Sequence, residues 1–115
     1  MNKFVFKDYF HDPESKIAKR MLYKSDNVIA FILNIATGEM LPAHTHVEST
    51  LLLQILDGEA NVVTDGKETP LRTGELIQVD GQESMQVYNT GDVILRLLVS
   101  ISPIGMDAFA HDADI

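Results

Sequence analysis

The stretch that decides the fold is GEMLPAHTH, residues 38–46, in which one residue separates His44 from His46. In an extended strand, side chains two residues apart point to the same face, so we expect both imidazoles to converge. Two convergent neutral imidazoles suit a first-row transition metal. If the strand continued regularly, Glu48 would join that face and add a carboxylate to the two histidines. The alternative is that the histidines are surface or core residues with ordinary hydrogen bonds.

Outward from this stretch, the chain consists of short β-like segments separated by turn residues. The segments expected as strands are residues 4–6, 28–35, 40–46, 51–56, 60–64, 67–72, 76–79, 84–88 and 93–101. Gly, Asn and Asp between them supply the positive φ angles of tight hairpins, and Asp65-Gly66 is the strongest such signal. About nine short strands at regular spacing predict an all-β sandwich or barrel without repeats or linkers.

Two segments depart from this pattern. Residues 13–23 alone show helical periodicity, with Asp12 as a potential N-cap, although residues 20–23 are equally compatible with an extended strand. The acidic tail, residues 107–115, is expected either to fray or to form a short helix docked through Phe109.

The composition limits the classes of function. A chain of 115 residues suits one domain, and its net charge of −8 argues against nucleic acid as a partner. The absence of cysteine excludes disulfides, a thiolate nucleophile and sulfur-ligated zinc. No apolar run is long enough to cross a bilayer, and the N-terminal residues do not resemble a signal peptide. We therefore expect a soluble, cytoplasmic protein that does not bind membranes.

Two spaced sets of residues surround and follow the histidines: Gly38, Pro42, His44, His46 and Gly58, then Gly74 and Asn89. They resemble the first and the second sequence motif of the cupin superfamily. The resemblance covers about residues 28–102. It implies one cupin domain over residues 1–115, a double-stranded β-helix (jelly-roll) barrel of antiparallel strands with an N-terminal arm (1–27) and an acidic tail (103–115). A homodimer is the corresponding family expectation.

Two of the four metal ligands that the resemblance implies are replaced. Leu51 stands at the position of the motif's glutamate, and Met85 at that of its third histidine. Leucine cannot bind a metal, and the neutral thioether of methionine suits only soft ions such as Cu(I). His44 and His46 alone would hold a divalent Fe, Mn, Ni or Zn ion weakly, unless Glu48 compensates.

The barrel interior is the second candidate site. Small barrels either fill their interior with side chains or leave room for one small ligand. Alternation along the strands directs four apolar side chains toward the space expected for the two histidines, which predicts a mainly apolar pocket. The alternative is that all four are simply core residues. The four are Leu51, Leu53, Met85 and Val87.

Three functions follow from these observations. Leu51 and Met85 favour a barrel that has partly lost its metal site and binds a small organic ligand. The retained histidines keep open a metal-dependent enzyme of the dioxygenase or isomerase type, with His44, His46 and Glu48 around the ion. A structural role through dimerisation is the third. No glycine-rich phosphate loop or nucleophile elbow is present, so no catalytic residue is assigned.

Overall fold

The computed structural model describes residues 1–103 and 112–115, and these residues are mostly β-strand. Two antiparallel sheets face each other, in the orders β10-β1-β2-β9-β4-β7 and β3-β8-β5-β6. The all-β antiparallel barrel predicted from the sequence is thereby confirmed. The elements are η1 (Phe6–Tyr9), β1 (Ile17–Lys24), β2 (Ile29–Ile35), β3 (Met40–His44), β4 (Thr50–Asp57), β5 (Glu59–Thr64), β6 (Lys67–Arg72), β7 (Leu76–Asp80), β8 (Met85–Asn89), β9 (Leu95–Ser102) and β10 (Ala113–Asp114).

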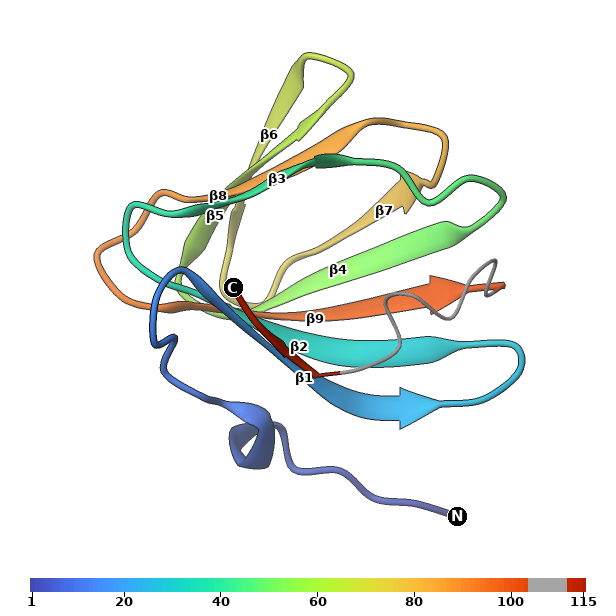
Figure 1. Ribbon diagram of the computed structural model, residues 1–115. Coiled ribbons are helices and arrows are strands. Elements are labelled where there is room, and N and C mark those ends of the chain that lie inside the picture. Colours follow the sequence, from blue (N-terminus) through green and yellow to red (C-terminus); the bar gives the residue numbers. More distant parts are fainter. Residues whose placement is uncertain (104–111) are drawn as a thin grey trace.

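The barrel has two unlike ends. The sheets lie close together where β4 turns into β5, and they spread apart toward the opposite side (Figure 1). We call the first side the Gly58 end, after the residue between those two strands. The second side is the His46 end, because the loop from β3 to β4 crosses it. Strand β4 runs from one end to the other, so the two ends are separated by its full length.

Inward side chains of the larger sheet form successive layers, because directly opposed residues of antiparallel strands share a face. Nearly all of these side chains are apolar and buried, and they make up one half of the core. From the Gly58 end to the His46 end, the layers are Ile17, Ile35 and Leu95; Lys19, Leu33, Leu97 and Ile55; Met21, Phe31, Val99 and Leu53; and Ile29, Ile101 and Leu51.

The helical periodicity of residues 13–23 does not produce a helix, because residues 17–24 form strand β1, which pairs with β2. The alternative of an extended strand over residues 20–23 is confirmed. Two features of strand β1 obscure its alternating pattern in the sequence. Its inward positions include Lys19, which interrupts the apolar alternation, and the register shifts between Met21 and Tyr23. The range expected as an arm therefore contributes a strand, and the sheet begins at Ile17 instead of at residue 28.

The strand predicted over residues 4–6 is also wrong, because residues 6–9 form the 3-10 helix η1. The N-terminal segment lies against the outer face of the larger sheet. The Asn34 side-chain amide, which is fully buried, donates a hydrogen bond to the backbone oxygen of Tyr9 over 3.3 Å. Arg96 stacks on the Phe10 ring at 5.0 Å and pairs with Asp12 at 2.8 Å. These contacts explain how a polar residue is buried on the outside of the barrel.

The chain returns to β1 at its C-terminal residues. Strand β10 pairs with β1, and Ile115 exchanges two backbone hydrogen bonds with Ile17, of 2.8 and 3.0 Å. The predicted docking through Phe109 lies outside the described residues. Across the described ranges, no helix has the length and apolar character required to cross a bilayer.

Candidate functional site

The loop between β3 and β4 carries His46, and its backbone is held by the loop that follows β7. The N–H of His46 donates to the oxygen of Gly81 over 2.8 Å, and the N–H of Gly81 donates to the oxygen of Ser49 over 2.8 Å. A third bond, of 3.0 Å, runs from the N–H of Ser49 to the oxygen of His46. A Cβ at position 81 would overlap the oxygens of His46 and Ser49, so only glycine fits there. We call these three bonds the Gly81 clamp.

The two histidine rings meet as the sequence predicts. Their centroids are 4.8 Å apart with an edge-to-face angle of 86°, and both side chains are partly exposed. His44 pairs with Met85 across β3 and β8, so these two residues share the inner face of the smaller sheet. Nδ1 of His44 lies 2.8 Å from the oxygen of Pro42. Because a carbonyl only accepts hydrogen bonds, Nδ1 carries the proton in neutral His44, and Nε2 keeps its lone pair.

His46 is neutral at physiological pH. Burial is the main reason that its pKa falls to about 4, and the nearby His44 and Lys19 charges lower it further. A neutral imidazole offers one N–H donor and one nitrogen acceptor. The pair His44 and His46 can therefore exchange hydrogen bonds or protons with a ligand, as well as coordinate an ion.

Glu48 does not join the histidines on a common strand face. Strand β3 ends at His44, and Glu48 lies exposed in the following turn with a φ of 72°. Regular alternation is lost once the strand ends, which is why spacing alone misplaced this side chain. Within residues 1–103 and 112–115, no three His, Cys, Asp or Glu side chains are grouped so that they could hold a metal ion.

The four apolar residues predicted to line the pocket are buried in the core. Leu51 and Met85 are each 2% exposed, and Leu53 and Val87 are fully buried. Among the described residues, the potential ligand beside the histidine pair is therefore the thioether of Met85, and no carboxylate joins it. That set does not fit a divalent first-row metal, which usually requires at least three nitrogen or oxygen ligands from the protein.

Lys19 is the residue of this region that the sequence did not reveal. It lies opposite Leu33 on the inward face of β1, and it is only 8% exposed. Its Nζ atom stands 4.5 Å from the centroid of the Phe31 ring, one layer nearer the His46 end than its own backbone. Burial lowers the pKa of Lys19, and the Asp112 carboxylate partly offsets this effect. From the sequence, Lys19 could have been placed on an inward face only if residues 17–24 had been predicted as a strand.

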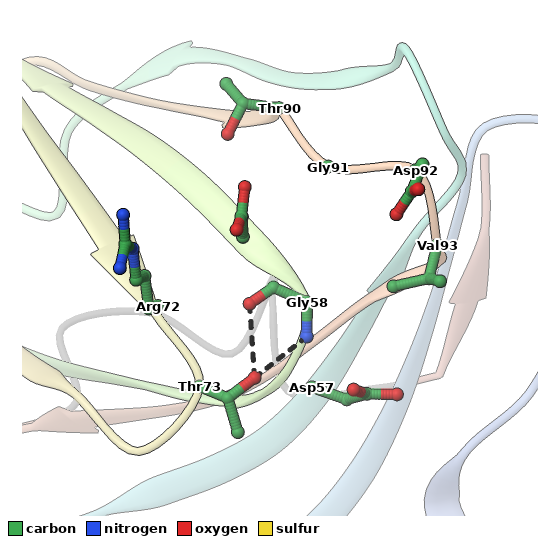
Figure 2. Close-up of a pocket in the computed structure, with 9 residues that line it drawn as sticks. Asp57, Gly58, Arg72, Thr73, Thr90, Gly91, Asp92 and Val93 are labelled. Atoms are coloured by element: carbon green, nitrogen blue, oxygen red, sulfur yellow. Dashed lines mark hydrogen bonds between the residues drawn. The ribbon is translucent and has the colours of Figure 1, made fainter.

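The Gly58 end carries an open hollow of about 660 Å³. Arg72 and Asp92 lie on opposite sides of it, and the Thr73 hydroxyl is bonded to the backbone of Gly58 (Figure 2). Its charged side chains are exposed, so water screens their charges. The lining residues are Asp57, Gly58, Glu59, Arg72, Thr73, Thr90, Gly91, Asp92 and Val93.

Comparison with known proteins agrees with this geometry. The chain is 29% identical over 72 residues to the tetracenomycin polyketide synthase protein TcmJ of Streptomyces glaucescens, a match covering 63% of this chain and 48% of that protein. The crystal structure of TT1209 from Thermus thermophilus superposes with a TM-score of 0.84 at 22% identity, covering 90% of this chain and 99% of that one.

An RmlC-like cupin protein from Desulfovibrio desulfuricans superposes with a TM-score of 0.81 at 23% identity, covering 90% of this chain and 98% of that one. These likenesses confirm the cupin-type barrel. The sequence profile of the cupin domain matches residues 31–101, which is more than half of the chain and includes both histidines. The chain therefore belongs to the cupin domain family.

Proposed function

We propose that this cupin binds a small organic ligand between its two sheets at the His46 end, without a resident divalent metal. One observation carries the proposal: two imidazoles lie 4.8 Å apart and partly exposed, while Leu51 and Met85, at the positions of the remaining ligands, are buried apolar groups. Ligand sites in proteins typically combine an apolar wall with a few convergent polar groups.

The two histidines would contribute differently to such a ligand. In the neutral state, Nε2 of His44 is an acceptor, because its Nδ1 is committed to the oxygen of Pro42. His46 is neutral at pH 7 and supplies one donor. The Gly81 clamp holds the backbone of His46, so the backbone of this loop loses little freedom when a ligand binds.

A metal-dependent enzyme is the second candidate, and one observation favours it. Histidines that coordinate metals usually donate their other ring N–H to a carbonyl or carboxylate, and His44 does so toward Pro42. In that case His44 and His46 would hold the ion and the ion would act as a Lewis acid. The lack of a third nitrogen or oxygen ligand within residues 1–103 and 112–115 counts against this candidate.

Two measurements on the full chain, purified without a histidine tag, separate the candidates. Elemental analysis after incubation with Fe(II), Mn(II) or Ni(II) should find far less than one ion per chain. A fragment screen by NMR in the presence of a chelator should find ligands that shift the His44 and His46 signals. His44→Ala/His46→Ala should abolish binding of these fragments, whereas Thr90→Ala at the Gly58 end should preserve it. Stoichiometric metal that the double variant loses would instead establish the metal site.

A further inference from the structure

The outer face of the smaller sheet carries a hollow of about 430 Å³. Strand pairing places its side chains on that face: Val63 of β5 lies opposite Gln86 of β8 and Glu68 of β6, and Asn61 lies opposite Tyr88. The residues between them along β5 and β8 are fully buried in the core. The hollow therefore lies on the other side of this sheet from the histidine pair.

Asn61 contributes a buried hydrogen-bond acceptor to the lining of this hollow. Its side-chain N–H group donates a hydrogen bond of 2.9 Å to Oε1 of Glu68, which fixes the orientation of the amide. The amide oxygen, Oδ1, is buried and has no hydrogen-bond partner within residues 1–103 and 112–115. A buried acceptor without a partner costs free energy, which a ligand that donates a hydrogen bond to it would recover.

The charge at this hollow is negative. Glu68 lines it beside Asn61 and forms no ion pair within the same described ranges. None of the described residues that line the hollow is basic, and the whole chain carries a net charge of −8. This field attracts cations and repels anions. The Tyr88 ring adds an aromatic surface on which a planar cation can stack.

We propose that this hollow binds a small organic cation with a planar amidinium or guanidinium group. Such a group carries several N–H donors, so it can donate to Oδ1 of Asn61 and to the adjacent Glu68 carboxylate while it lies against Tyr88. The apolar part of the ligand would rest on Val63. The site does not involve the histidine pair, so the inference does not depend on the proposed function.

The test compares two ligands of nearly the same shape, the benzamidinium cation and the neutral benzamide. Affinities for the full chain are measured by NMR titration at pH 7 and low salt, from the shifts of the Asn61, Val63 and Tyr88 signals. Benzamidinium should bind about fivefold more tightly than benzamide, the upper range for a charge pair that water can reach. High salt should remove most of this preference, because it screens the Glu68 charge.

Three variants locate the interaction. Glu68→Gln keeps an acceptor for the Asn61 amide but removes the charge, so it should abolish the preference by weakening benzamidinium alone. Glu59→Gln changes the net charge by the same amount, from an exposed position on the same strand as Asn61, and should retain the preference. Asn61→Leu should weaken both ligands roughly threefold or more, because both donate a hydrogen bond to Oδ1.

Each contrary outcome overturns the inference. Equal binding of benzamidinium and benzamide by the natural chain would mean that the hollow does not select a cation. A preference that persists in Glu68→Gln would place the attraction elsewhere on the acidic surface. Unchanged affinities in Asn61→Leu would mean that the ligand does not use this acceptor. If neither ligand shifts signals of β5 or β8, the hollow is not a binding site. Asn61→Ala is a second variant in case Asn61→Leu does not fold, and circular dichroism checks each variant.

Discussion

The two ends of the barrel hold polar side chains in opposite settings. At the Gly58 end, three carboxylates and one guanidinium surround an open hollow, and every one of these groups is exposed. At the His46 end, the residues described by the structure include two imidazoles and one ammonium, and burial lowers the pKa of His46 and of Lys19. Desolvation is the largest cause of both shifts, because burial penalises the charged form of a side chain.

The largest expected effect comes from restoring ligands at the His46 end. Leu51→Glu/Met85→His places a carboxylate and an imidazole in the core, and should lower the free energy of unfolding by about 4 kcal/mol without metal. Added Ni(II) or Zn(II) should recover most of this loss, because the site would gain its missing donors. Thermal unfolding with and without metal measures both effects.

The control for this experiment is Leu51→Gln/Met85→Gln, which is comparably polar but lacks the carboxylate and the imidazole. Its melting temperature should not respond to metal. If the natural chain gains as much thermal stability from Ni(II) as the Glu/His variant does, then Leu51 and Met85 are not the reason for weak metal binding.

The next effect compares a glycine from each end. Gly81→Ala should cost about 2–4 kcal/mol of unfolding free energy, because the new methyl group would overlap backbone oxygens that cannot move without breaking the Gly81 clamp. Gly91→Ala, at the Gly58 end, should cost less than about 1 kcal/mol, since its Cβ would meet neighbours at an ordinary 3.5 Å. Urea unfolding of both variants measures the two losses of unfolding free energy. Similar losses for Gly81→Ala and Gly91→Ala would show that the Gly81 clamp is not rigid.

The smallest effect concerns pH. Unfolded His46 binds a proton below about pH 6.5, whereas the folded chain binds it only below about pH 4. The unfolded state therefore binds more protons between these values, and stability falls as the pH is lowered from 6.5 toward 4. His46→Asn should remove about 1–2 kcal/mol of this pH-dependent loss of unfolding free energy, after allowance for the partial exposure of His46.

Urea unfolding at pH 7 and pH 4.5 measures the difference between the natural chain and His46→Asn. Thr90→Ala, from the Gly58 end, should behave like the natural chain. An identical pH dependence in all three proteins would mean that His46 is not desolvated, and the contrast between the two ends would then disappear.

The sequence predicted the barrel well because its strands carry apolar residues at every second position and glycines at the turns. The pattern around His44 and His46 also placed the two rings together correctly. Glu48 was misplaced, since strand β3 ends at His44 and the regular alternation stops there. The inward position of Lys19 was missed because a lysine among apolar residues breaks the alternation of a strand and fits the polar face of a helix. Only the pairing of β1 with β2 reveals the strand.

The Gly81 clamp also bears on how such a barrel can change over evolutionary time. It fixes the backbone of His46 through main-chain bonds, so the position of this loop does not depend on which side chains occupy residues 51 and 85. Substitutions at those two positions can then alter the chemistry of the site while the scaffold that presents His46 persists. A lineage could pass between metal-dependent and metal-free activities by few steps, and a protein engineer could follow the same route in reverse.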